Sequence, residues 1–93
     1  MAWLVLSNLM NRVSEATNQY RLFLHNDDFN SMEYVLKTLV DIVPELTTPQ
    51  AVNAMMEAHH AGVGLIVVCD VATAKSYCEA LCDRELSVTI EPN

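Results

Sequence analysis

The chain is short and acidic, with 93 residues, 52% hydrophobic side chains and a formal net charge of −7 at pH 7. This length and apolar content are typical of one domain built around one hydrophobic core. The two glycines and three prolines are too few for a disordered or low-complexity chain. The negative charge argues against nucleic-acid binding, which depends mainly on Lys and Arg, and favours partners with ammonium or basic groups.

The first ten residues form an apolar run with no basic residue before it. The run is too short to span a bilayer and lacks a convincing cleavage site, so we expect neither a membrane span nor a targeting signal. We expect a mobile N-terminal arm over residues 1–19 and one folded domain over residues 20–93. The three cysteines, with no secretory signal, indicate reduced thiols in a cytosol-like compartment.

The predicted domain begins with a strand and a helix. Residues 20–25 alternate between two faces, as strands do, and the Asn-Asp-Asp sequence at 26–28 favours a turn. A helix is expected after Asn30 or Ser31, either of which is a suitable N-cap, and Pro44 stops it. Its apolar stripe consists of Met32, Val35, Leu36, Leu39, Val40 and Val43.

A second helix is expected between Thr48, as its N-cap, and Gly62, which suits the left-handed position at a helix C-terminus. The face expected to turn inward carries Val52, Met55, Met56 and His59. The short apolar run Leu65–Cys69 follows and predicts a buried strand.

The last third of the chain predicts a third helix and a third strand. Asp70 is the expected N-cap of the helix, and residues 86–91 alternate as a strand. The apolar stripe of this helix consists of Val71, Ala74, Cys78, Leu81 and Cys82. The order β-α-α-β-α-β therefore predicts a small α+β domain, with a three-stranded antiparallel sheet packed against three helices.

Catalytic motifs are not evident in the sequence. There is no glycine-rich phosphate loop, serine elbow or spaced zinc signature. Asp27 and Asp28 could form an acid–base site with His59, but neighbouring aspartates after a strand are more often turn formers. We therefore expect a protein that is not an enzyme and needs no cofactor.

Cys78 and Cys82 are one helical turn apart and could ligate a metal with His59 or His60. Packing is the favoured interpretation, because both cysteines fall on the apolar stripe and Cys packs as a small hydrophobe. We expect no metal site. The role of His59 stays open: it is either a core or helix-terminal histidine, or it faces a pocket lined by methionines, which adapt to varied ligands.

Three segments together resemble the ClpS family. The first is Leu-His-Asn-Asp-Asp-Phe at 24–29, followed by Met-Glu-Tyr-Val at 32–35. The second is Ala-His-His-Ala-Gly at 58–62, and the third is Leu-Ser-Val-Thr-Ile-Glu at 86–91. The resemblance covers about residues 20–91.

The resemblance implies an adaptor that binds the free α-amine and the bulky first residue (Phe, Tyr, Trp or Leu) of N-degron substrates. It also implies delivery to the N-terminal domain of a Clp AAA+ chaperone of the ClpC or ClpA type. The amine would be bound by Asn26, Asp27, Asp28 and His59. The pocket would be lined by Met32, Val35, Met55, Ala58 and Leu86, with Asn30 and Ser31 at its rim. Met32 would screen against branched first residues.

Two departures and two alternatives accompany this resemblance. Asn30 and Ser31 stand where relatives often have Thr-Pro, and Ala58 stands where a larger aliphatic residue is common. One alternative is a protein-interaction domain of the same fold that does not bind N-degrons. The other is a small hydrolase that uses Asp28 and His59. We expect a monomer that binds neither nucleic acid nor membranes, in the cytoplasm or alternatively in the plastid stroma.

Overall fold

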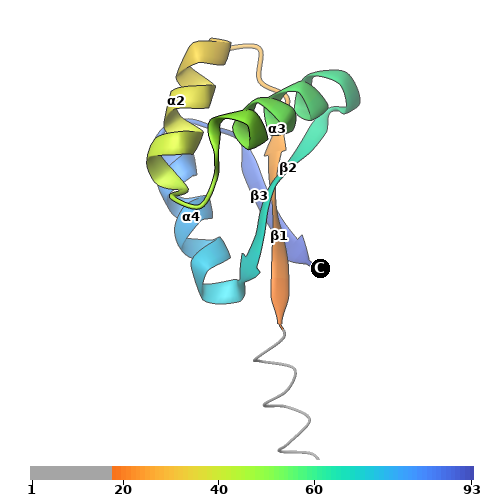
Figure 1. Ribbon diagram of the computed structural model, residues 1–93, viewed down its shortest axis with the longest axis vertical. Coiled ribbons are helices and arrows are strands. Elements are labelled where there is room, and N and C mark those ends of the chain that lie inside the picture. The colour runs from red at the N-terminus through yellow and green to blue at the C-terminus, as the bar shows by residue number, and fades with distance from the viewer. Residues whose placement is uncertain (1–17) are drawn as a thin grey trace, which may run out of the picture.

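The predicted order of strands and helices is confirmed by the computed structural model, which describes residues 18–93. The elements, labelled in Figure 1, are β1 (Gln19–His25), α2 (Met32–Ile42), α3 (Thr48–Ala61), β2 (Val63–Asp70), α4 (Val71–Asp83) and β3 (Val88–Pro92). Most of the expected N-terminal arm lies outside the described residues. None of the helices within residues 18–93 is long and apolar enough to cross a membrane.

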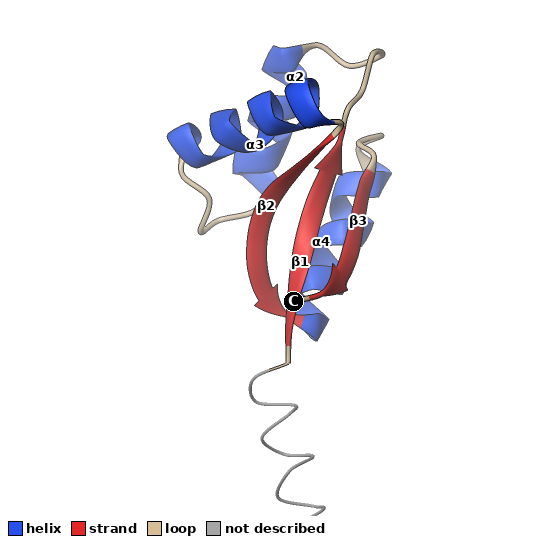
Figure 2. Ribbon diagram, turned by 90° about the vertical axis from the view of Figure 1, so that its right-hand side faces the viewer, coloured by secondary structure: helices blue, strands red, loops and turns tan. Residues whose placement is uncertain are grey.

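The three strands form one antiparallel sheet in the order β2-β1-β3. Both α3 and α4 contact the sheet, and α2 packs against these two helices. Figure 2 shows α4 behind the sheet and α3 across its upper end, near the point where β1 stops. The termini of β1 and β3 that lie far from α3 meet through a hydrogen bond from Asn93 N to Gln19 O of 2.9 Å.

The hydrophobic core lies between the sheet and the helices. Its fully buried large side chains are Leu22, Leu39, Val43, Leu81 and the polar Thr38. The Thr38 hydroxyl donates a hydrogen bond of 2.7 Å to Tyr34 O one turn earlier, so its burial leaves no donor unpaired. The core therefore contains residues from β1, α2 and α4.

The buried face of α3 differs from the prediction. Three residues expected to turn inward are exposed, namely Val52, Met56 and His59, the first two by 38% each. The buried residues are instead Ala51, Ala54, Met55 and Ala58. The reason is the close approach of α3 to β2, since a Cβ atom on Gly64 would lie only 2.0 Å from Ala54 O. Only small side chains fit between backbones at this separation.

The helix N-termini are set by their capping residues. Of the two candidates for α2, Ser31 is the N-cap, and its Oγ accepts from Tyr34 N at 3.1 Å. The N-cap of α3 is Thr47, so this helix begins one residue earlier than predicted. Thr47 and Gln50 form a capping box, in which the side chain of each residue accepts a hydrogen bond from the backbone N–H of the other. Thr48 cannot form such a box, because the residue three positions after it is Ala51.

The strand β2 is buried on one face only, which corrects the prediction of a buried strand. Ile66 is buried, whereas Leu65 and Val68 are exposed on the face that the helices leave uncovered. The predicted apolar stripe of α4 is also only partly buried, since Cys82 is exposed. The last strand begins at Val88 rather than at residue 86, although Leu86 is still part of the core.

Candidate functional site

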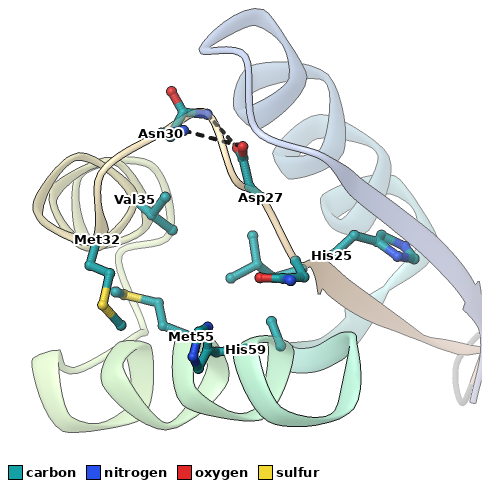
Figure 3. A pocket seen from close by; sticks show the side chains of 10 residues that line it. His25, Asp27, Asn30, Met32, Val35, Met55 and His59 are labelled. Atoms are coloured by element: carbon teal, nitrogen blue, oxygen red, sulfur yellow. Dashed lines mark hydrogen bonds between the residues drawn. The ribbon is translucent and has the colours of Figure 1, made fainter.

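A pocket opens at the end of β1, between α2 and α3. It is lined by Leu24, His25, Asn26, Asp27, Asn30, Met32, Val35, Met55, Ala58 and His59. Its empty space is about 380 Å³, including the part open to solvent at the mouth. Figure 3 shows Met32 and Val35 approaching from α2, Met55 and His59 from α3, and Asp27 and Asn30 from the loop after β1.

The pocket has an apolar interior and a polar edge. Val35, Met55 and Ala58 are buried and form its inner wall, while Met32 is 53% exposed at the mouth. Asn26, Asp27 and His59 line it with polar groups. Such a cavity suits a ligand with a bulky apolar part and an adjacent group that donates hydrogen bonds.

Asp27 organises the loop that forms the polar edge. Its Oδ1 accepts from Phe29 N at 2.8 Å and from Asn30 N at 3.2 Å, while its other oxygen accepts from the Asn30 amide. The same Asn30 amide donates to Glu85 O at 3.0 Å, which connects the loop to the segment before β3. These bonds fix the orientation of the carboxylate and of the backbone around it.

The loop is also connected to α3 and β3 through the backbone. Asn26 N donates to Gly62 O at 3.0 Å, and His25 N donates to Ser87 O at 2.9 Å. Gly62 has φ of 88°, a left-handed conformation that glycine adopts without strain. The Gly62 carbonyl, directly after the last turn of α3, therefore binds the loop that follows β1. His59 belongs to that last turn.

The pKa of Asp27 is lowered from its ordinary value. Partial burial raises this pKa, but the hydrogen bonds from Phe29 N and from the side chain and backbone of Asn30 favour the charged form and outweigh burial. Asp27 is therefore a carboxylate at neutral pH. A fixed negative charge at the pocket edge attracts a cationic ligand group.

His59 belongs to the last turn of α3 and borders the pocket beside Met55 (Figure 3). Its ring meets the His60 ring edge to face, with centroids 5.3 Å apart. The sequence left open whether this histidine is a core residue. The structure places it on the exposed side of the helix, at the pocket wall.

The structure brings most of the predicted site residues together. Those that line the pocket are Asn26, Asp27, Asn30, Met32, Val35, Met55, Ala58 and His59. Those outside the lining are Asp28, Ser31 and Leu86. Asp28 is exposed on the loop, Ser31 caps α2, and Leu86 is buried in the core.

Sequence reasoning missed two lining residues, Leu24 and His25. Leu24 is the last buried residue of β1. The alternation in this strand could have identified it, because the last inward residue of a strand lies next to any pocket at the end of that strand. His25 contributes at the end of β1, while its side chain points away from the pocket in Figure 3. Its Nε2 lies 2.7 Å from Thr89 Oγ1 on β3.

The fold and this pocket define a small binding domain for a ligand that combines an apolar group with hydrogen-bond donors. Residues 15–89 match the protein family described as ATP-dependent Clp protease adaptor protein ClpS. The chain belongs to the ClpS family of Clp protease adaptors.

Similar proteins include adapters from cyanobacteria and from a plant. The ATP-dependent Clp protease adapter protein ClpS of Synechococcus elongatus is 56% identical over 75 residues, which cover 81% of this chain and 79% of the relative. The same adapter from Synechococcus sp. (strain CC9902) is 47% identical and covers 95% and 85% of the two chains. A chloroplastic Clp protease adapter of Arabidopsis thaliana is 42% identical, over 80% of this chain and 46% of the relative.

A solved structure has the same fold. It is Agrobacterium tumefaciens ClpS2 bound to L-phenylalaninamide, with a TM-score of 0.73 and 28% sequence identity. The match covers 82% of this chain and 98% of the solved chain. Together with the family match, it confirms the predicted three-stranded sheet with three helices.

Proposed function

We propose that the pocket binds the first residue of N-degron substrates, holding the free α-amine at the polar edge and a Phe, Tyr, Trp or Leu side chain in the apolar interior. The adaptor then delivers these substrates to the N-terminal domain of a Clp AAA+ chaperone of the ClpC or ClpA type. The observation that carries the proposal is the Asp27 carboxylate, held in place beside an apolar pocket. The solved relative adds support, since L-phenylalaninamide combines a free amine with a phenyl ring.

The α-ammonium of a substrate has three N–H donors, so it needs several acceptors at one place. The Asp27 carboxylate, the Asn26 carbonyl and a ring nitrogen of His59 can provide them. Each charge-assisted hydrogen bond contributes about 1.5–3 kcal/mol. Burial of a Phe or Leu side chain adds about 1.5–3 kcal/mol. After the cost of association, these contributions support micromolar affinity.

The residues outside the lining have indirect roles in this proposal. Asp28 is exposed next to Asp27 and acts on the ammonium through water and through its charge. Leu86 supports the pocket from the core, and Ser31 fixes the start of α2 beneath Met32. We infer that the protein binds its substrate without changing it chemically.

We place the adaptor in the bacterial cytosol, with the plastid stroma as the alternative, and we propose a monomer. The relatives support either compartment, since they include cyanobacterial adapters and a chloroplastic one. The net charge of −7 opposes close association between copies of the chain and keeps each copy soluble.

The direct test compares a labelled peptide that begins with a free Phe and the same peptide with its N-terminus acetylated. We expect fluorescence anisotropy to show micromolar binding of the free form and its loss on acetylation, because the acetyl group removes the charge and two of the three donors. Equal binding of both peptides, or no binding of peptides beginning with Phe, Tyr, Trp or Leu, would refute the proposal.

Met32→Ala is expected to widen the range of accepted first residues. Met32 is half exposed at the mouth, so shortening it opens space at little cost to stability. We expect affinity for peptides beginning with Val or Ile to rise about tenfold, because one methylene group more or less in a hydrophobic pocket is worth about 1–3 kcal/mol.

Met56→Ala is the matched control, since Met56 is an exposed methionine outside the lining. It should leave the preference for first residues unchanged. Continued exclusion of Val and Ile by Met32→Ala would show that another residue limits the pocket.

A further inference from the structure

Two thiols meet on the side of the molecule where α4 packs against β3. Cys78 and Cys82 are one helical turn apart, and neither forms a disulfide. Their Sγ atoms lie 3.7 Å and 4.0 Å from the same acceptor, the carbonyl oxygen of Val88 at the start of β3. The two sulfur atoms therefore converge on one point instead of packing into separate parts of the core.

Solutes can reach this pair. The thiols line an open groove together with Lys75, Glu79 and Ile90, with an empty space of about 710 Å³ that includes open solvent. Cys82 is exposed and Cys78 is partly buried. Burial raises the pKa of Cys78, and the neighbouring Cys82 thiol and Glu79 raise it further. The convergence on the Val88 carbonyl oxygen places the two sulfur atoms close to each other.

The number of sulfur atoms indicates which metal the pair suits. A structural zinc site needs four ligands. Residues 18–93 contain no group of three or more His, Cys, Asp or Glu side chains placed to hold a metal. The histidines considered from the sequence, His59 and His60, belong to α3, which does not contact α4. Zinc would therefore be held by only half of the ligands it requires.

Cu(I) needs fewer ligands than zinc does. It is a soft cation that prefers thiolate ligands, and two sulfurs on opposite sides complete a linear site. A Cu(I) ion bound by two thiolates carries one negative charge, which the Lys75 ammonium in the same groove attracts and the Glu79 carboxylate repels. Binding releases two protons from the thiols and needs no oxidant or reductant, because copper stays in the +1 state.

We infer that Cys78 and Cys82 form a two-thiolate site for Cu(I) on α4. This site is separate from the pocket at the end of β1, and the inference does not depend on substrate binding there. The third cysteine, Cys69, is at the other end of α4, next to its N-cap, and takes no part in the site.

The test is an anaerobic titration of the reduced 93-residue chain with Cu(I) against a competing chromogenic chelator. We expect one Cu(I) per chain. We expect Cys78→Ser and Cys82→Ser each to lower the affinity at least about 100-fold, because one remaining thiolate loses the advantage of two linked ligands. Cys69→Ser is the matched control and should bind as the unaltered chain does. Circular dichroism of each variant checks that the domain stays folded.

Three outcomes would overturn the inference. The first is equal Cu(I) affinity in the folded Cys78→Ser and Cys82→Ser variants and the unaltered chain. The second is a ratio of one Cu(I) per two chains, which would indicate a bridge between molecules. The third is a loss of binding in Cys69→Ser as large as in the other two variants.

Discussion

Asp27→Ala is expected to weaken binding of a peptide with a free N-terminal Phe at least about tenfold, since a charge-assisted hydrogen bond contributes about 1.5–3 kcal/mol. The substitution removes the carboxylate that would accept the ammonium. It also removes the acceptor for Phe29 N, Asn30 N and the Asn30 side chain, so the loop loses its fixed shape. Fluorescence anisotropy with the labelled Phe peptide measures the change.

Two further variants separate the loss of the carboxylate from the loss of the loop's shape. Asp28→Ala removes the neighbouring carboxylate, which is exposed and outside the pocket lining, and we expect a change of about threefold or less, as for exposed ion pairs. Asp27→Asn keeps an oxygen that can accept from Phe29 N and Asn30 N but removes the charge. Near-normal binding by Asp27→Asn would assign the effect to the two backbone hydrogen bonds that this variant keeps, whereas weak binding would assign it to the charge together with the acceptor for the Asn30 side chain, both of which the variant removes. If Asp28→Ala is the more damaging of the two alanine variants, our assignment of the amine to Asp27 is wrong.

This pair of aspartates also shows the limit of prediction from the sequence. The Asn-Asp-Asp turn was recognisable, because these residues favour turns after a strand. Which of the two aspartates lines the pocket depends on the turn's backbone conformation, and here Asp27 lines it while accepting hydrogen bonds from Phe29 N and Asn30 N. Residue type alone does not distinguish two neighbouring aspartates of which only one lines the pocket.

The element order was predictable because each boundary carries a local signal. Asp70 caps α4 by accepting from Thr73 N at 2.8 Å, as expected from its position before the helix. Gly62 ends α3 in the left-handed conformation, also as expected. Such signals depend on a few adjacent residues, so they can be recognised without knowledge of the tertiary structure.

The inward face of α3 was not predictable by the same means. Hydrophobicity favoured Val52 and Met56, whereas the face that packs against β2 consists mainly of alanines. The decisive residue is Gly64, which lies in another element and allows the two backbones to approach. A helical period identifies a stripe of apolar residues, but the distance to the partner element determines whether large or small side chains are buried.

The close contact of α3 with β2 also positions the pocket, since Met55, Ala58 and His59 approach it from α3. A Cβ atom on Gly64 would lie 2.0 Å from Ala54 O and 2.9 Å from Ala58 N. These are backbone atoms of a helix, so they cannot move aside as a flexible side chain would. The distance between α3 and β2 at Gly64 therefore cannot increase unless the whole helix moves.

Gly64→Ala is accordingly expected to cost about 3 kcal/mol or more of unfolding free energy, at the upper end of the range for overpacked cores. For a domain of this size, that cost lowers the melting temperature by about 12 °C or more. Gly62→Ala is the matched control: it has open space around the added methyl group but keeps φ at 88°, so we expect a loss of only about 1–2 kcal/mol. Urea unfolding followed by circular dichroism measures both values. A smaller loss in Gly64→Ala than in Gly62→Ala would mean that α3 can move away from β2, and that Gly64 does not set the distance on which the pocket depends.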